Sequence, residues 1–268
     1  MANPYSVLMS VYSEENAVNL RQSIESVMTQ DFPAAEFVLV IDGPIGSALE
    51  EVINSYPTIK VVRLPENVGR GTALNEGLKH TSYDIVARMD SDDIATPSRM
   101  GKEYSKISEG LDIVSAPVYE FEGNISYLTG QRDVPRTQEE IIEYSKKRNP
   151  FNHPCVMFRK SAVIEAGGYT SDYPLFEDYD LWIRMLRNGA KCANLNEPLL
   201  YMRTDEGMYL RRGGMEYAKI MLNFHKMLMT SGWTSKKDYY TGAIPHAIVC
   251  AMPEFVRRGV YRKLHQRP

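Results

Sequence analysis

Short apolar runs alternate with segments of helical periodicity in the first half of this 268-residue chain, and this alternation constrains the fold more than any other feature. The apolar runs cover residues 7–11, 37–41, 59–64 and 85–89. Between the first two runs, apolar residues from Ala17 to Val27 recur at helical spacing, and we expect Ser13 to cap that helix. Apolar runs separated by helical segments are typical of βαβ units. The pattern therefore predicts an α/β fold with a central, mostly parallel sheet flanked by helices.

Polar groups follow three of these predicted strands at the point where each strand ends. Asp42 follows the second strand, and the glycine-rich residues 67–71 follow the third. The acidic segment Asp90-Ser91-Asp92-Asp93 follows the fourth. Ligands of open parallel sheets bind at the carboxyl ends of the strands. We therefore expect one crevice to collect all three groups.

The acidic segment places three carboxylates within four residues, which is unfavourable unless a cation or solvent relieves their repulsion. Carboxylates spaced like Asp90 and Asp92 can bind one Mg²⁺ or Mn²⁺ while substrate phosphates and water fill the other positions. The alternative is an acidic turn in which Asp93 or Thr96 caps the helix that begins near Pro97. The position directly after an apolar strand favours the metal site.

The glycine-rich segment Asn67-Val68-Gly69-Arg70-Gly71 leads into a predicted helix. Its glycines permit close backbone approach, and the helix N-terminus with Arg70 can face an anion. A plain turn explains the segment equally well. It has neither the phosphate-loop pattern nor the dinucleotide G-x-G-x-x-G pattern.

A second acidic group, formed by Glu177, Asp178 and Asp180, stands at the mouth of an apolar helix. A carboxylate in this position is either a helix cap or a general base aimed into a cleft. Three carboxylates in four positions are more than capping requires. His153, before a predicted strand at residues 155–158, is more typical of a hydrogen-bonded structural histidine than of a ligand or base.

The net charge of −3 divides unevenly along the chain: the first 210 residues carry 20 basic and 31 acidic residues, and the remainder carries 11 and 3. This balance excludes a generally basic nucleic-acid-binding protein. We find no apolar stretch of ~18 residues and no signal-peptide pattern in residues 1–12, and we expect a cytoplasmic protein. The three cysteines lack metal-type spacing and are expected to be reduced, structural thiols.

The basic C-terminal part begins with Arg211-Arg212-Gly213-Gly214, a turn that either clamps phosphates or is simply solvated. An amphipathic helix is predicted over residues 217–228. Residues 253–268 mix apolar and basic side chains. They either lie on an anionic membrane surface, which we favour, or pack on the core with a solvated basic face.

Taken together, these motifs resemble family 2 glycosyltransferases of the GT-A fold. The resemblance covers roughly residues 5–212, and the motifs occur in the family's order and spacing. The matching segments are residues 6–12, 40–44, 67–77, 88–93, 153–154, 167–169 and 177–182.

The resemblance implies a role for each matching residue of the nucleotide half. Asp42 would accept a hydrogen bond from a uracil ring, beside the backbone of residues 10–12. Asp90 and Asp92 would form the D-x-D motif that contacts the ribose and, chiefly through Asp92, the metal on the diphosphate. The further residues implied to contact the nucleotide sugar are Ser10, Tyr12, Asn67, Gly69, Arg70, Ser91, Arg211 and Arg212.

On the acceptor side the resemblance implies that Asp178 is the catalytic base. Glu177, His153 and Trp182 would support that site. Some relatives place a histidine metal ligand in the stretch equivalent to residues 201–212, and this chain has none there. Arg211 and Arg212 would then take over part of the charge neutralisation on the diphosphate.

The resemblance also implies the domain organisation and the activity. A GT-A catalytic domain would span residues 1–212, with a nucleotide-sugar half at about 1–118 and an acceptor half at about 119–212, followed by a helical extension at 213–268. We expect an inverting transferase that moves a hexose from a UDP-sugar to a lipid-diphosphate-linked or oligosaccharide acceptor in bacterial surface polysaccharide synthesis. It would work at the cytoplasmic face of the inner membrane.

Two alternatives are a transferase of the same fold that uses a dTDP-sugar, such as a rhamnosyl donor, and a non-catalytic sugar-nucleotide or polysaccharide-binding protein. A binding protein needs no catalytic base, so the presence of both Asp92 and Asp178 argues against it.

Overall fold

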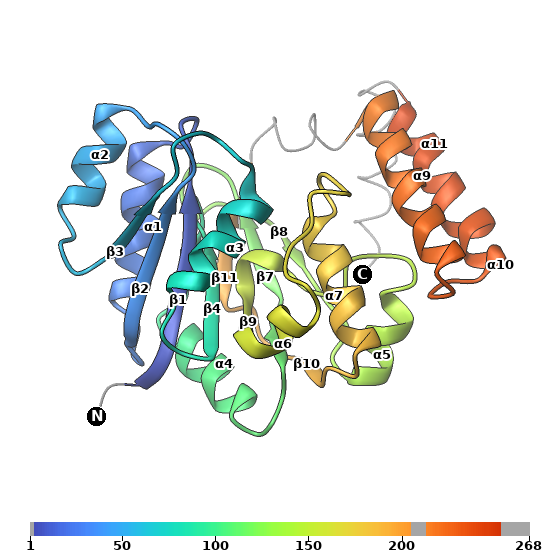
Figure 1. Cartoon of the computed structure of the whole chain (residues 1–268), viewed down its shortest axis with the longest axis horizontal. Helices are drawn as coiled ribbons and strands as arrows, with labels where there is room; N and C mark the ends of the chain where they lie inside the picture. Colours follow the sequence, from blue (N-terminus) through green and yellow to red (C-terminus); the bar gives the residue numbers. More distant parts are fainter. Residues whose placement is uncertain (1–2, 205–212, 253–268) are drawn as a thin grey trace.

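The protein is built around a seven-stranded sheet flanked by helices, as a computed structural model that describes residues 3–204 and 213–252 shows (Figure 1). The strand order is β10-β6-β9-β4-β1-β2-β3, and β9 alone in this sheet runs antiparallel to its neighbours in the described chain. The strands are β1 (Asn3–Val11), β2 (Ala34–Ile41), β3 (Lys60–Arg63), β4 (Ile85–Asp90), β6 (Ile113–Ser115), β9 (Val156–Arg159) and β10 (Cys192–Asn194). The predicted α/β fold with a mostly parallel sheet is confirmed.

Helices cover both faces of this sheet and create two separate apolar cores. Side chains of alternate strand positions point to opposite faces, so Val7 and Met9 belong to one core and Leu8 to the other. The first core includes α1 (Ala17–Met28), α2 (Ser47–Asn54) and α4 (Arg99–Ile107). The second core includes α3 (Arg70–His80), α5 (Gln138–Tyr144), α6 (Lys160–Glu165) and α7 (Glu177–Arg187).

A four-stranded sheet, of order β5-β11-β7-β8, lies at the end of β4. Its strands are β5 (Ile94–Ala95), β7 (Val118–Phe121), β8 (Leu128–Arg132) and β11 (Leu200–Arg203). A short 3₁₀ turn, η1 (His153–Cys155), leads into β9. Because β5 begins at Ile94, directly after Asp93, the acidic segment joins the large sheet at β4 to this second sheet at β5.

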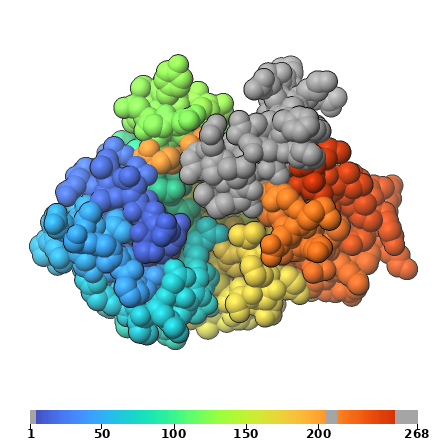
Figure 2. Space-filling model, turned by 90° about the horizontal axis from the view of Figure 1, so that it is seen from above, coloured from blue at the N-terminus to red at the C-terminus, as the bar shows by residue number. Residues whose placement is uncertain are grey.

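Residues 213–252, the described C-terminal part, contain four helical elements: α9 (Met215–Thr230), α10 (Lys236–Asp238), the π-helical η2 (Tyr239–Ala243) and α11 (Ile244–Ala251). They pack on the face of α7 that points away from the large sheet, through a third core that includes Phe176, Tyr179 and Phe224. Viewed from above, these helices occupy one end of the molecule and the N-terminal strands the other (Figure 2). The predicted helix at 217–228 is confirmed, and α7 is buried on both sides.

One local prediction was wrong, and the capping alternative for the acidic segment is excluded as well. Ser13 does not cap α1, because the Oδ1 of Asn16 accepts hydrogen bonds from the Val18 and Asn19 amides at 2.8 and 3.3 Å. Neither Asp93 nor Thr96 caps α4, whose N-cap position is Ser98.

The three cysteines, all within the described residues, are buried, as structural thiols would be. Within residues 3–204 and 213–252, every helix is too short or too polar to cross a membrane. The expectations for Arg211, Arg212 and the basic segment 253–268 lie outside the described residues.

Candidate active site at the strand ends

The carboxyl ends of β1, β2 and β4 meet at one edge of the large sheet. Ser10 pairs in register with Asp90 on one side and with Val40 on the other. The Asp42 amide donates to the Val11 carbonyl at 2.8 Å, so Asp42 lies beside the end of β1. Ser10 is half-buried, and Tyr12, beyond the end of β1, is 46% exposed. The polar groups expected to share one crevice therefore do come from adjacent strand ends.

Asp42 holds the glycine-rich segment in place. Its Oδ1 accepts from the Val68 amide at 2.8 Å and its Oδ2 from the Gly69 amide at 3.1 Å. Gly43 has φ +83°, and a Cβ there would lie 2.6 Å from the Asn67 amide nitrogen, so only glycine fits this close approach. Asn67 is exposed at the tip of the turn. Residues 67–69 form a loop that leads into α3 at Arg70, and the buried Asp42 carboxylate holds this loop in place.

The three carboxylates of the acidic segment differ in their partners. Asp90 pairs with the guanidinium of Arg88, and Asp93 Oδ1 accepts from the Arg203 amide at 2.7 Å. Among the described residues, the Asp92 carboxylate has no partner beyond its own backbone amide. One ligand oxygen from each of Asp90, Asp92 and Asp93 lies within 4.8 Å of the others. Hard divalent cations prefer such oxygen ligands, so the donor set fits Mn²⁺ or Mg²⁺.

The charge states of these carboxylates reflect their partners. Burial, together with the charges of Asp90 and Glu15, raises the pKa of Asp92 to about 7. Burial also raises the pKa of Asp93 well above its ordinary value. Although burial opposes it, Arg88 and Arg70 hold the pKa of Asp90 below its ordinary value. Asp90 is therefore charged at neutral pH, whereas Asp92 takes up or loses a proton near it.

Ser91 is buried, and its hydroxyl donates to Glu15 Oε2 at 2.5 Å. Its side chain therefore joins the acidic segment to the loop after β1. Arg203 continues this network on the other side, because its Nε donates to the Asp92 carbonyl at 2.9 Å and its guanidinium lies over the Phe121 ring. The backbone around Asp92 is thus fixed from both sheets.

The second acidic group lies at the start of α7. Asp178 Oδ1 accepts from the Tyr179 amide at 2.7 Å, and Oδ2 accepts from Asn149 Nδ2 at 2.8 Å. Burial and the charge of Glu177 raise the pKa of Asp178, and Arg70 opposes this rise. The N-cap position is Phe176, without a side-chain cap, so capping does not account for Asp178. A half-buried carboxylate with a raised pKa suits a general base.

Arg70 connects the two acidic groups. Its Nε donates to Glu177 Oε1 at 2.9 Å, and Asp90 and Asp178 both raise its pKa together with Glu177, against the effect of burial. The guanidinium is thus placed between the acidic segment and the start of α7. Asp180, in contrast, pairs with Arg184 at 2.8 Å and belongs to the framework of α7.

His153 and Trp182 lie beneath this site rather than on its surface. His153 Nε2 lies 3.0 Å from the Tyr169 hydroxyl, and burial with the nearby Arg88 and Arg70 charges lowers its pKa well below the ordinary value. Trp182 has no exposed surface and packs edge-on against Phe151. Both side chains can support the site but cannot act at its surface in this conformation.

Sequence reasoning did not assign a site role to Glu15, Arg88, Asn149 or Arg203. The sequence does mark Arg88, because it is a charged residue inside an otherwise apolar strand, two positions before Asp90. The other three reach the site from loops or strands that are distant in sequence, and no local pattern marks them.

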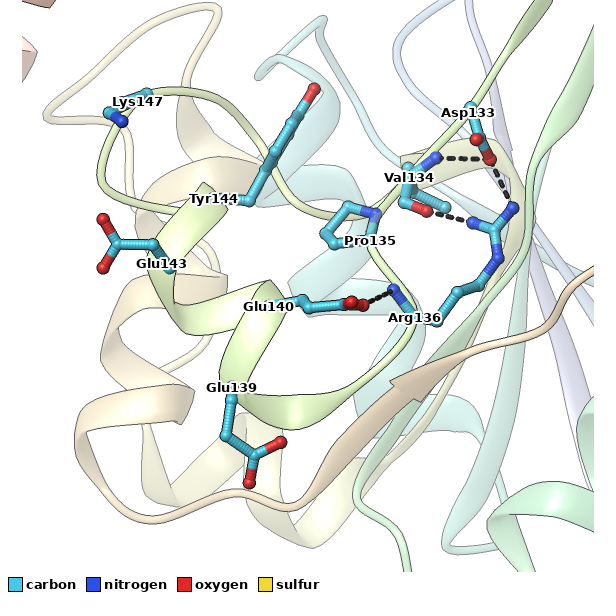
Figure 3. Close-up of a pocket in the computed structure, with 9 residues that line it drawn as sticks. All are labelled: Asp133, Val134, Pro135, Arg136, Glu139, Glu140, Glu143, Tyr144 and Lys147. Carbon is cyan, nitrogen blue, oxygen red and sulfur yellow. Dashed lines mark hydrogen bonds and ion pairs between the residues drawn. The ribbon is translucent and has the colours of Figure 1, made fainter.

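A surface cavity of about 720 Å³ lies apart from these carboxylates, between α5 and the turn that precedes it (Figure 3). Its lining residues are Asp133, Val134, Pro135, Arg136, Glu139, Glu140, Glu143, Tyr144 and Lys147. Arg136 is already bound to Asp133 and to the Val134 carbonyl. The cavity contains neither the acidic segment nor Asp178.

The chain is similar to known proteins along most of its length. The family model "Glycosyl transferase family 2" matches residues 6–167. An uncharacterized glycosyltransferase of Haemophilus influenzae is 43% identical over 83% of this chain and 84% of its own length. The UDP-Gal:alpha-D-GlcNAc-diphosphoundecaprenol beta-1,3-galactosyltransferase of Escherichia coli is 34% identical over 98% and 97%.

Among solved structures, the mannosyltransferase PcManGT of Pyrobaculum calidifontis, in complex with GDP-Man and Mn²⁺, superposes with a TM-score of 0.67. The superposition covers 98% of this chain and 81% of that one, at 15% identity. At this identity the match shows a shared fold.

Proposed function

This chain belongs to glycosyltransferase family 2, and on that premise we propose that it transfers a hexose from a UDP-sugar to a lipid-diphosphate-linked sugar, with inversion at the anomeric carbon. The observation that carries the proposal is the placement of Arg70, which bonds to Glu177, between two acidic groups. One contains Asp92, whose carboxylate has no partner but its own amide within residues 3–204 and 213–252, and the other contains Asp178. A donor site and a base beside it are what a single displacement requires.

The donor nucleotide would lie along the strand ends. Asp42 would accept a hydrogen bond from the uracil ring, beside Ser10 and Tyr12. Its two oxygens already accept from the Val68 and Gly69 amides, but each carboxylate oxygen can accept more than one hydrogen bond. Asp90 would receive the ribose, and the turn of Asn67 and Gly69 would lie against the sugar. Ser91 would contribute to the nucleotide site by holding the backbone of the acidic segment, through its hydrogen bond to Glu15.

Asp92, with Asp90, would hold a divalent cation, which when bound neutralises charge on the leaving diphosphate. The Pyrobaculum calidifontis enzyme of the same fold was solved with Mn²⁺, which supports this assignment. Arg211 and Arg212 would add positive charge to the same diphosphate. Arg70, fixed by Glu177, presents a further cation between donor and acceptor sides.

Asp178 would remove the proton of the acceptor hydroxyl as that oxygen attacks the anomeric carbon from the face opposite to UDP. One base suffices, because the leaving diphosphate is a good leaving group once its charge is neutralised. A single displacement gives inversion. His153 and Trp182 support the acceptor side from beneath.

The Escherichia coli relative, whose name gives UDP-Gal as donor and a GlcNAc-diphosphoundecaprenol as acceptor, supports a UDP-hexose and a lipid-linked acceptor here. We assign the catalytic domain to residues 1–212, with a nucleotide half at about 1–118 and an acceptor half at about 119–212, and the helical extension to 213–268. Such an acceptor requires the enzyme at the cytoplasmic face of the inner membrane, where the basic residues of 253–268 would meet anionic lipid.

A donor screen tests this function. Purified protein with Mn²⁺ and a synthetic GlcNAc-diphospho-lipid is incubated separately with UDP-Gal, UDP-Glc, UDP-GlcNAc and dTDP-rhamnose, and the lipid product is measured by mass spectrometry. We expect addition of a hexose from one UDP-sugar. Asp178→Asn should lower the rate of product formation about 10²- to 10⁴-fold. Asp172→Asn, which changes an exposed carboxylate before α7, should leave it unchanged. Product from dTDP-rhamnose alone would overturn the uridine assignment of Asp42.

A further inference from the structure

We propose that Asn149 is the positioning residue of the Asp178 carboxylate, setting the orientation in which Asp178 meets the acceptor hydroxyl. This inference rests on the proposed function, because it takes Asp178 as the base. Asn149 lies after α5, 29 residues before Asp178 along the chain. It follows no strand of the large sheet and belongs to none of the motifs considered above.

Two hydrogen bonds of Asn149 define its orientation. Its Nδ2 donates to Asp178 Oδ2 at 2.8 Å, and its Oδ1 accepts from the Phe151 amide at 3.3 Å. Because a backbone amide can only donate, it occupies the oxygen end of the side-chain amide and leaves the nitrogen end for Asp178. With Oδ1 of Asp178 bound to the Tyr179 amide, each carboxylate oxygen has one fixed donor. The plane of the carboxylate is therefore set before any acceptor arrives.

The turn that carries Asn149 is itself held at Ser145, which has no exposed surface. The Ser145 carbonyl accepts from the Tyr179 hydroxyl at 2.6 Å, and its hydroxyl accepts from Trp233 Nε1 at 3.2 Å. Tyr179 belongs to α7 and Trp233 to the C-terminal part. Asn149 is thus presented by a turn that two packed elements fix, which is what a positioning residue requires.

A donor to the charged form of a carboxylate favours that form, so Asn149 also favours the state in which Asp178 can accept a proton. The other ionisable groups facing Asp178 are Glu177, Arg70, Arg88, Tyr169 and Tyr179. Glu177 disfavours the charged carboxylate, and the two arginines favour it. Among the described residues, Asn149 is the one uncharged side chain that bonds directly to Asp178.

Three variants separate positioning from a merely structural role. Asn149→Ala removes both bonds, and Asn149→Asp keeps the size and the acceptor for Phe151 but places a carboxylate against Asp178. The matched control is Asn188→Ala, which removes an exposed side-chain bond at the other end of α7. We expect kcat of Asn149→Ala to fall about 10-fold with the KM for the UDP-sugar within about twofold, and the acid limb of kcat to move up by about one pH unit. The kcat of Asn149→Asp should fall further than that of Asn149→Ala, and the kcat of Asn188→Ala should match that of the wild type.

A second measurement does not depend on activity. In protein labelled with ¹³C at the aspartate carboxyl carbons, the Asp178 signal, assigned by its loss in Asp178→Asn, is followed during a pH titration. We expect the pKa of Asp178 to be higher in Asn149→Ala than in the wild type, and unchanged in Asn188→Ala. An unchanged titration in folded Asn149→Ala would overturn the inference. Absence of transfer by the wild type with every donor would instead overturn the proposed function and leave the titration as the test of the contact.

Discussion

At the scale of single residues, the site depends on carboxylates whose charge is not fully compensated by the protein. Asp90 and Asp93 have partners, whereas Asp92 has none beyond its own amide among the described residues. Asp178 is held by neutral donors and faces Glu177 on the same helix. These are the two side chains to which we assign the metal and the acceptor hydroxyl.

Mn²⁺ binding should compete with protonation of Asp92. The pKa of Asp92 is raised to about 7, and a metal binds the charged carboxylate. Below that pH, the apparent Mn²⁺ affinity should therefore fall by up to about 10-fold for each pH unit. Titration of Mn²⁺ by electron paramagnetic resonance between pH 5.5 and 8 measures this. Asp92→Asn should bind Mn²⁺ weakly at every pH. Equal affinities for the two proteins would show that Asp92 is not a ligand.

Transfer at saturating Mn²⁺ should require the charged form of Asp178. The pKa of Asp178 is raised above its ordinary value of 3.8. We therefore expect kcat/KM to be constant at pH values above this raised pKa and to decline as pH falls through it. Rates measured from pH 4.5 to 8 give the acid limb. A rate that stays constant down to the lowest pH at which the wild type remains folded would contradict a base with a raised pKa.

Local patterns sufficed to place Asp42, Asp90, Asp92 and Asp178 in the fold, because each stands at a strand end or a helix start that apolar runs mark locally. It did not suffice for Asn149, Glu15 and Arg203. Arg203, for example, reaches the Asp92 carbonyl from 111 positions away, on a strand whose pairing with β5 and β7 no local pattern specifies. Partners across the fold depend on tertiary packing, which periodicity alone does not give.

At the scale of elements, α7 is central because it separates two apolar cores. Leu181 and Trp182 face the large sheet, and Phe176, Tyr179 and Ile183 face α9 and α11. Apolar periodicity predicted both α7 and α9 but not their contact. The rings of Phe176 and Phe224 stack with their centroids 5.0 Å apart at the point where α7 begins. Packing of the C-terminal helices therefore supports the start of α7, where Asp178 lies.

Removing the Phe224 ring tests this support. Phe224 has no exposed surface, so Phe224→Ala should lower the free energy of unfolding by about 3–5 kcal/mol, as large-to-small core changes do. Urea denaturation measures it, and transfer should fall as well. Ile248→Ala, at a 54% exposed position of α11, should cost less than about 1 kcal/mol. Similar losses for the two variants would show that the third core is not formed.

His225 should make the stability of this part depend on pH. Burial and the nearby His246 lower its pKa from 6.5 to about 4. Between these values the unfolded chain binds a proton that the folded chain does not, so this residue lowers the free energy of unfolding as pH falls from about 6.5 to about 4. His225→Phe should therefore lose less stability than the wild type between pH 7 and pH 5 in urea denaturation. An identical loss would show that His225 is not buried in its neutral form.

At the scale of the whole molecule, the ends of β1, β2 and β4 bring Asp42 and Asp90 to one edge of the large sheet, where we propose that donor and metal bind. The charge of the chain is distributed to match this proposal. The acidic first 210 residues contain the carboxylates of that edge. The basic remainder would serve the donor diphosphate and an anionic membrane. Because net charge and its asymmetry are sequence properties, this aspect was predictable, whereas the packing of the C-terminal helices on α7 was not.

The stereochemistry of transfer tests the central claim most directly. The lipid-linked product formed from the preferred UDP-hexose is examined by ¹H NMR for the coupling of its new anomeric proton, with wild-type protein and with Asp178→Asn. We predict a β-linked product from the α-linked donor, and a rate about 10²- to 10⁴-fold lower in Asp178→Asn. An α-linked product, or an unchanged rate in a folded Asp178→Asn, would contradict single displacement with Asp178 as the base.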